Sequence, residues 1–279
     1  MNHDPSVLKA IFDTLKGTLI REGDQHERAV PMGDGLRVVA RRATEDFRNA
    51  DNDKYFRQMV HVVFYAGMKA ATVTKALDAI DKHFPSYTVA AGYGASEIAA
   101  IMNDTSMIRN RRKIEACIHN AKKFVEICSK RSFVEYLGSF ASDKSRWKAI
   151  KEFKFMGKIT SFHYLMEIGY PLLKPDRVVS RIFSRLGLVN GLPEPILHPN
   201  PTKFSEDQLW QIVEVGERIA DATGHAIRYV DLVFVTYGQV KGQDPEGLSQ
   251  GICLDNKPKC YLCGLRDECQ YSPKTVSPL

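Results

Sequence analysis

The chain has 279 residues, of which 44% are hydrophobic and 26% charged, and its formal net charge is +6. These values suit one large folded domain or two modest ones, with a substantial core. The sequence contains no tract of low complexity. No apolar run reaches the roughly 18 residues that a membrane span requires, and the N-terminus lacks a basic segment followed by an apolar core. We therefore expect no membrane association, no secretory signal and a cytoplasmic location.

Apolar residues recur at helical spacing along most of the chain. Asp4 followed by Pro5 indicates the start of the first helix, because an acidic N-cap and a proline at the first helical position are typical of helix starts. Few stretches alternate with period two, so strands should be minor and the fold class is all-α. Further helices are expected over residues 55–65, 70–83, 96–102, 112–129, 132–140, 160–167 and 205–224, the last with a capping box.

Basic residues are concentrated in the middle of the chain. Residues 109–131 contain eight basic and two acidic residues, and residues 144–185 contain ten basic and three acidic residues. Such a surface is either a solvated helical face or a phosphate-binding face, and charge alone leaves both open. The candidates for phosphate contact at the start of the first run are Arg109, Arg111 and Arg112.

A tight turn between two helices is predicted around Gly157, after a helix that ends near Phe153. The N–H groups of such a turn and of the following helix form a phosphate site, and glycine lets the backbone come close to the ligand. An ordinary helix–turn–helix is the alternative. The candidate contact residues of this hairpin are Lys154, Met156, Gly157, Lys158 and Thr160.

Four cysteines near the C-terminus follow the pattern C-x6-C-x2-C-x5-C, and they are Cys253, Cys260, Cys263 and Cys269. Thiolates this close in sequence can surround one metal centre, either a [4Fe–4S] cluster or a single zinc. Zinc sites usually carry two C-x2-C pairs, and only one is present here, so the spacing favours the cluster. Four unligated thiols are the remaining alternative.

The cysteine spacing, together with the flanking runs 257–260 and 268–271, resembles the cluster loop of the endonuclease III family of DNA glycosylases. Asp176 stands nineteen residues after Gly157 and opens a segment with Arg181 and Arg185 that resembles the helix–hairpin–helix glycosylases. The resemblance implies a two-lobed, all-α helix–hairpin–helix DNA glycosylase fold with a C-terminal [4Fe–4S] cluster loop. We expect N-terminal helices over 1–54 that pack with the C-terminal lobe, a central lobe over 55–170 that ends in the hairpin, and a C-terminal lobe over 171–279 whose cluster loop is 253–269.

The resemblance also implies that Asp176 is the catalytic carboxylate. Breaking an N-glycosidic bond develops positive charge on the sugar, which a carboxylate stabilises while it positions the attacking water. Capping of a helix is the alternative role for this residue. Endonuclease III uses a lysine nucleophile two positions after the hairpin glycine, where this chain has Ile159. We therefore expect a monofunctional enzyme that hydrolyses the bond and leaves the strand intact.

The run 107–124, the hairpin 153–160 and the pair Ala66-Gly67 resemble 3-methyladenine DNA glycosylase I. The chain departs from that family at Val62 and Ala70, which replace a base-binding glutamate and a tryptophan. The resemblance implies excision of damaged bases, with alkylated purines the leading substrate, from double-stranded DNA by a monomer associated with the nucleoid. The alternatives are a glycosylase for uracil, mismatched or oxidised bases, and a non-catalytic iron–sulfur DNA-binding protein.

The target base must leave the duplex to reach the carboxylate, so the gap in the stack needs a filler. Gly67 and Met68 fall in the loop that inserts into DNA in the family, and Met68 is the candidate wedge, with a core position as the alternative. Candidates for the base pocket, each also compatible with a packed core position, are His61, Phe64, Tyr65 and His163.

Overall fold

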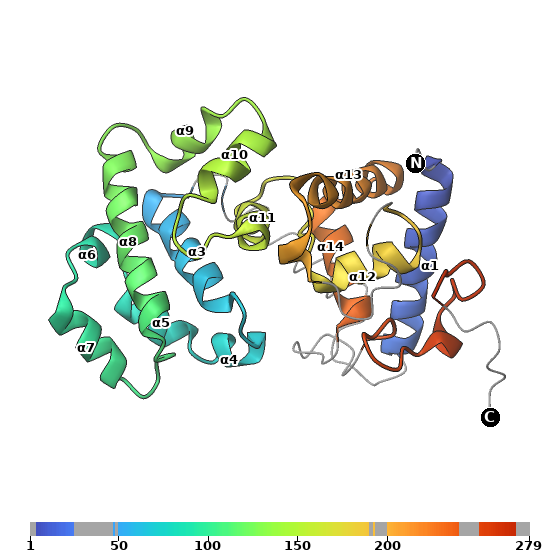
Figure 1. The fold of residues 1–279 in the computed structure, drawn as a ribbon, viewed down its shortest axis with the longest axis horizontal. Coiled ribbons are helices and arrows are strands. Elements are labelled where there is room, and N and C mark those ends of the chain that lie inside the picture. Colours follow the sequence, from blue (N-terminus) through green and yellow to red (C-terminus); the bar gives the residue numbers. More distant parts are fainter. Residues whose placement is uncertain are drawn as a thin grey trace. The chain divides into compact units, whose positions relative to one another are not determined.

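The computed structural model describes residues 4–24, 47, 50–189, 192, 200–239 and 251–271. Every regular element in these ranges is helical, and they contain no strand, which confirms the all-α fold class (Figure 1). The chain divides into two compact units, one formed by Met1–Thr44 with Pro171–Leu279 and the other by Glu45–Tyr170. Of the predicted N-terminal segment 1–54, residues 1–3, 25–46, 48 and 49 lie outside the described residues.

The Glu45–Tyr170 unit is organised around two long helices, α3 (Asn52–Tyr65) and α8 (Arg111–Cys128), which pack against each other (Figure 1). Aromatic rings fill its interior, and Phe124 stacks on Phe133 with ring centroids 4.1 Å apart. The other helices of this unit are α4 (Ala70–Thr74), α5 (Leu77–His83), α6 (Tyr87–Ala91), α7 (Ala95–Asn103), α9 (Phe133–Gly138), α10 (Asp143–Ile150) and α11 (Lys158–Glu167).

One predicted helix of this unit is wrong in its length. The expected helix over 70–83 is interrupted, because Ala76 leaves the helical region with φ −103° and ψ 2°. Its N–H donates to the carbonyl of Val73, three residues back, so the α4 turn tightens and a new helix begins at Leu77. The side chain of Ala76 is buried, so the break lies inside the packed unit.

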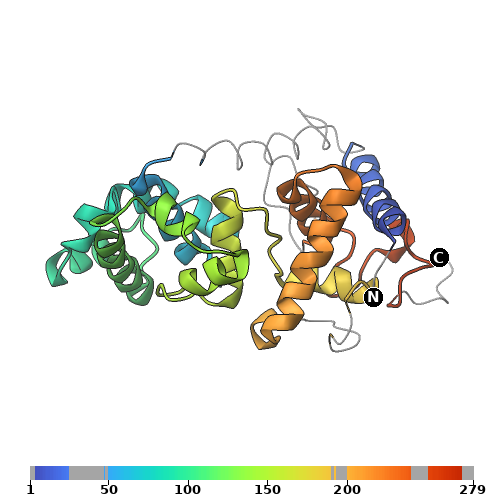
Figure 2. The same ribbon diagram turned by 90° about the horizontal axis from the view of Figure 1, so that it is seen from above.

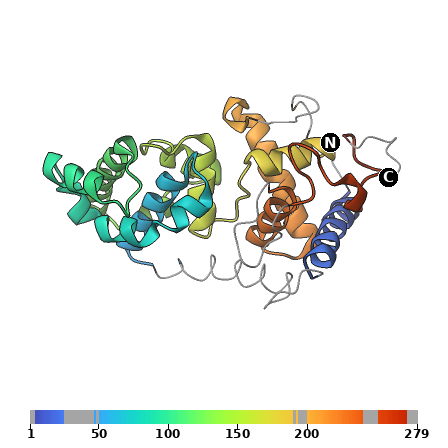
Figure 3. The same cartoon turned by 90° about the horizontal axis from the view of Figure 1, so that it is seen from below.

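The second unit contains α1 (Pro5–Asp24), α12 (Arg177–Arg185), α13 (Glu206–Thr223) and α14 (Ile227–Gly238), with short 3-10 turns at Pro201–Lys203 and Cys260–Leu262. Helix α1 packs on α13 and α14, and α12 packs on α14 (Figure 2). Ser205 caps α13 and Gly224 ends it at φ +68°, as the sequence predicted. The loop that carries the four cysteines lies beside α1, where the Arg21 guanidinium donates to the Leu262 carbonyl at 3.5 Å (Figure 3).

None of the helices in the described ranges combines the length and the apolar character needed to cross a membrane.

Candidate functional site

The turn between α10 and α11 forms the predicted hairpin. Gly157 is the N-cap of α11 and offers no side-chain cap to the first turn of that helix. The turn is closed by hydrogen bonds from the Met156 N–H to the Phe153 carbonyl, at 3.1 Å, and from the Thr160 hydroxyl to the Phe155 carbonyl, at 2.9 Å. The exposed backbone at Gly157 and the positive end of the helix dipole together suit an anionic ligand.

The side chains of the hairpin fall into two groups. Lys154 is exposed, and Lys158 and Thr160 are partly exposed, so these three can face a ligand. Met156 is only 1% exposed and its side chain belongs to the core, so only its backbone is available for a contact. Phe155 was not predicted as a contact, yet its ring is 41% exposed and its φ is +63°, a region that favours glycine.

The second basic segment lies at the start of α8. Arg109, Arg111 and Arg112 are all exposed, and Arg111 forms a 3.4 Å ion pair with Glu115 one turn further along. The Asn110 side chain caps the helix by accepting from the Lys113 N–H at 3.2 Å. Three guanidinium groups are therefore displayed around a helix N-terminus, an arrangement that suits phosphate groups.

The turn that follows α3 contains the predicted wedge loop. Gly67 has φ +69°, and a Cβ atom there would meet nothing within 4 Å. The Met68 N–H donates to the Tyr65 carbonyl at 3.1 Å, and the Met68 side chain is partly exposed. A reversal of the chain thus presents Gly67 and Met68 at the end of the helix, and the role of Met68 as a wedge stays a prediction.

The four candidates for the base pocket do not share one environment. Phe64 has no exposed surface, and its ring lies 6.3 Å from that of Phe84 in the core. His61 pairs through Nε2 with the Asp81 carboxylate at 2.5 Å. The rings of Tyr65 and His163 approach to 6.5 Å and both are partly exposed. The structure therefore brings Tyr65 and His163 together and leaves Phe64 no surface to offer a base.

Asp176 is the N-cap of α12. Its Oδ1 accepts from the N–H groups of Val178 and Val179 at 2.9 and 3.1 Å, so the capping role considered from the sequence is present. Its Oδ2 lies 3.3 Å from the Lys174 ammonium, and the carboxylate side chain is 23% exposed. One oxygen fixes the orientation of the carboxylate, and the other is paired with Lys174 in a side chain that is partly exposed.

The two arginines of α12 connect this helix to the cysteine loop. The Arg181 guanidinium donates to the carbonyls of Gly238 and Cys253, at 2.5 and 3.0 Å. Arg185 donates to the Leu254 carbonyl at 2.6 Å and to the Cys253 sulfur at 3.3 Å. Both arginines are buried, and their inward orientation was not predicted from the sequence.

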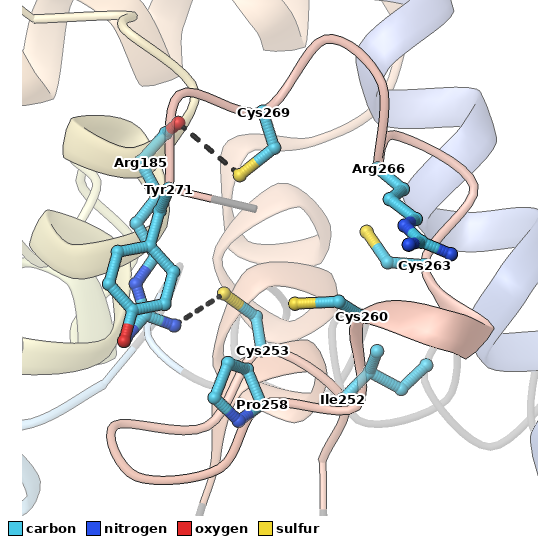
Figure 4. Close-up of a pocket in the computed structure, with 9 residues that line it drawn as sticks. All are labelled: Arg185, Ile252, Cys253, Pro258, Cys260, Cys263, Arg266, Cys269 and Tyr271. Carbon is cyan, nitrogen blue, oxygen red and sulfur yellow. Dashed lines mark hydrogen bonds between the residues drawn. The ribbon is translucent and has the colours of Figure 1, made fainter. Parts of the chain in front are cut away.

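The four cysteines line one cavity that is partly open to solvent, together with Arg185, Ile252, Pro258, Arg266 and Tyr271 (Figure 4). The Tyr237 hydroxyl donates to the Cys263 sulfur at 3.0 Å, and burial raises the pKa of the Cys263 thiol. Among the described residues, no three His, Cys, Asp or Glu side chains lie close enough to bind one metal ion. The loop therefore gathers four sulfurs around a space, but it does not place them as ligands of a single ion.

The sequence model of the methyladenine glycosylase family matches residues 46–163, which is most of the Glu45–Tyr170 unit. Among solved structures, the chain is similar to the Methanocaldococcus jannaschii 8-oxoguanine glycosylase/lyase in complex with DNA containing 8-oxoguanine. That match has a TM-score of 0.56 and 15% identity, over 81% of this chain and 95% of that one.

Two further structures share the arrangement. The 8-oxoguanine DNA glycosylase of Thermotoga maritima matches with a TM-score of 0.55 and 17% identity, over 81% of this chain and 95% of that one. A trapped endonuclease III–DNA covalent intermediate matches with a TM-score of 0.52 and 15% identity, over 86% and 92%. The predicted helix–hairpin–helix glycosylase fold is thus confirmed.

Proposed function

We propose that this protein is a monofunctional DNA N-glycosylase that excises alkylated purine bases from double-stranded DNA. The proposed substrate class is supported by the match to the methyladenine glycosylase family. The match covers the turn at Gly67 and Met68, here called the wedge turn, as well as the start of α8 and the hairpin. The proposed lack of strand cleavage follows from Ile159, which provides no amine at the position of the endonuclease III nucleophile. Lys158 precedes it by one residue, which turns its side chain about 100° around the helix.

The proposed DNA contacts come from three places in the Glu45–Tyr170 unit. The first turn of α11 binds a phosphate through backbone N–H groups, with Lys154 and Lys158 adding positive charge. The arginines at the start of α8 bind further phosphates. Met68 occupies the gap that the extruded base leaves in the stack, which offsets part of the few kcal/mol that unstacking costs.

Asp176 supplies the chemistry in this proposal. Water attacks the anomeric carbon of the sugar while the bond to the base nitrogen breaks and its electron pair moves to the base, and the proton that the water loses is released to solvent. The carboxylate stabilises the positive charge that develops on the sugar, and it orients the water through the oxygen not used in the cap. A base alkylated on a ring nitrogen is cationic, so it leaves as a neutral molecule and needs no proton from the enzyme. Hydrolysis assisted by one carboxylate is therefore sufficient.

The four cysteines are proposed to hold a [4Fe–4S] cluster. Ligands of one zinc lie about 2.3 Å from the metal, so the four sulfurs would be roughly 3.8 Å apart in a tetrahedral site. In a cluster each thiolate binds a different iron, and the sulfurs stand further apart around an occupied space. The support for a cluster is the spacing of the cysteines and the one cavity that all four of them line. With four cysteine ligands the cluster has no open iron, so its proposed role is to fix the fold of the loop.

The test is release of free bases from methylated genomic DNA, identified by mass spectrometry. We expect 3-methyladenine or 7-methylguanine from the wild type and none from Asp176→Asn. Asparagine caps helices as well as aspartate does, so this variant keeps the N-cap and loses only the charge. Release by both proteins would remove Asp176 from the chemistry.

An absence of release by a wild type that binds DNA tightly would exclude the alkylpurine substrate. Duplexes with uracil, mismatches and oxidised bases would then be assayed before a non-catalytic binder is accepted. For the monofunctional proposal, borohydride trapping of an enzyme–DNA adduct that disappears in Lys158→Ala would show that the enzyme is a lyase. Iron and sulfide measured per protein chain, with zinc measured in parallel, test the cluster.

A further inference from the structure

Helix α8 carries two buried polar side chains on its inner face. Lys113 is 3% exposed and Asn120 is 1% exposed. They are seven residues apart, close to two full helical turns, so they project from the same face, with the buried Cys117 between them. Burial of such groups costs free energy unless they are fully hydrogen-bonded. The hydrogen-bond partners of Lys113 and Asn120 therefore indicate the role of each side chain.

Lys113 binds the end of α3. Its Nζ donates to three carbonyls, those of Val63 at 2.9 Å, Phe64 at 2.6 Å and Ala66 at 2.6 Å. An ammonium has three N–H donors, so each one has an acceptor. The last carbonyls of a helix have no partner within the helix and form its negative end, which a cation stabilises. Burial lowers the pKa of Lys113 to about 8, so the group is still charged at neutral pH.

The carbonyls that Lys113 binds lead directly into the wedge turn. Ala66 is the C-cap of α3, and the chain reverses at Gly67 immediately afterwards. The hydrogen bond from Lys113 to the Ala66 carbonyl fixes the orientation of the backbone that leads into Gly67 and Met68. An apolar side chain at position 113 could fill the same space, but it could not hold the turn in one orientation.

Asn120 binds the hairpin in the same way. Its Oδ1 accepts from the Lys154 N–H at 2.8 Å, and its Nδ2 donates to the Lys154 carbonyl at 3.0 Å. Both backbone groups of one residue are thus held by one amide. Lys154 lies three residues before Gly157, so this pair of bonds fixes the approach to the phosphate-binding turn.

We propose that Lys113 and Asn120 are positioning residues that hold the wedge turn and the hairpin in register for DNA binding. The first turn of α8 carries Arg111 and Arg112, so one helix sets the relative placement of all three proposed DNA-contacting segments. This inference rests on the proposed function for the identity of the ligand, but its evidence is the pair of buried hydrogen-bond networks.

The test compares Lys113→Met and Asn120→Leu with Cys117→Ala, which removes another buried side chain from the same face of α8 and leaves both hydrogen-bonding side chains in place. The probes are an undamaged duplex and a duplex with a tetrahydrofuran abasic site beside 2-aminopurine. The fluorescence of 2-aminopurine reports unstacking of the DNA at the lesion. Loss of packing in the protein core does not by itself change this signal. All measurements are made at a temperature where each variant is folded by circular dichroism.

We expect Lys113→Met to bind the abasic duplex roughly tenfold more weakly and to lose the 2-aminopurine signal, because the wedge turn is no longer fixed. We expect Asn120→Leu to weaken binding to both duplexes and to lower the salt slope of log K by about one, as expected when a phosphate contact is lost. Cys117→Ala should leave all three readouts at their wild-type values, even if it is less stable.

Should all three variants lose affinity only in proportion to their loss of stability, the two residues are ordinary core residues and the inference is wrong. If Lys113→Met or Asn120→Leu does not fold, the milder Lys113→Gln and Asn120→Ser are measured by the same criteria. Base release by the wild type is assayed in parallel. If the variants show the expected losses of affinity but the wild type releases no base, the proposed activity is refuted and the positioning role remains.

Discussion

Phe155 combines two features that rarely occur together. It has φ +63°, in the left-handed region, and it carries a bulky ring that is 41% exposed, in the turn that leads to Gly157. For residues with a Cβ atom this conformation costs roughly 1–2 kcal/mol. Retention of the ring at this cost is understandable if the ring contacts DNA, so substitutions at position 155 should affect stability and DNA binding in different directions.

The comparison of Phe155→Gly with Phe155→Ala isolates the backbone cost. Both variants lose the ring and its half-buried packing, so that loss cancels between them. Glycine removes the cost of the left-handed conformation, which stabilises the folded state by about 1–2 kcal/mol relative to alanine. The greater conformational freedom of glycine in the unfolded chain destabilises the folded state by about 0.5–1 kcal/mol. We expect the glycine variant to be more stable than the alanine variant by about 1 kcal/mol, which corresponds to roughly 2–4 °C in Tm for a chain of this size class.

Thermal melts followed by circular dichroism measure the stability difference, and fluorescence anisotropy with an undamaged duplex measures affinity. The ring contact predicts that both variants bind DNA more weakly than the wild type by a similar factor, despite their different stabilities. Equal melting temperatures for the two variants would refute the argument from backbone strain. Wild-type affinity in both would show that the ring is not a DNA contact.

Three further results are expected. Asp176→Ala should lower the free energy of unfolding by about 1 kcal/mol through loss of the α12 cap, whereas Asp176→Asn should change it by only a few tenths, as urea titrations of both variants would show. Arg185→Lys should reduce the iron bound per chain and destabilise the unit by about 1–3 kcal/mol, because Arg185 reaches Leu254 and Asp255 through two separate nitrogens, Nη1 and Nη2, and one ammonium nitrogen cannot occupy both positions. The exposed Arg177→Lys on the same helix should change neither quantity. Gly216→Ala should lower Tm despite its better helix propensity, because the new Cβ would lie 2.8 Å from the buried Leu173 side chain, and a Tm equal to that of the wild type would show that Leu173 can move aside.

The features that the sequence predicted well are those encoded by neighbouring residues. The capping box at Ser205 and the glycine that ends α13 are satisfied within a few residues, so their pattern determines their geometry. The hairpin belongs to this class, since Gly157 directly precedes a helix. The four cysteines also gather around one cavity, as their close spacing requires.

The features that the sequence could not predict depend on which face of a helix is buried. Lys113 lies in a run of basic residues and would be counted with them, but its ammonium is inside the unit and binds α3. Met156 and Phe64 looked like contact residues because of their neighbours in sequence, yet the side chains of both are buried. Asn120 has no local signal at all, because its partner lies 34 residues away. Such contacts depend on tertiary packing, which no short sequence window contains.

The geometry at Asp176 also changes how its two candidate roles relate to each other. From the sequence, helix capping and catalysis appeared as rival explanations, but a carboxylate has two oxygens and the cap uses only Oδ1. Two N–H donors hold that oxygen, so the plane of the carboxylate is fixed before any substrate binds, and Oδ2 faces the Lys174 ammonium in a side chain that is 23% exposed. A group that must stabilise developing charge works best when it is already oriented, because no reorganisation is then needed during the reaction. The cap is therefore the means by which the fold prepares Asp176 for its proposed role, and only a substitution that keeps the cap while removing the charge separates the two.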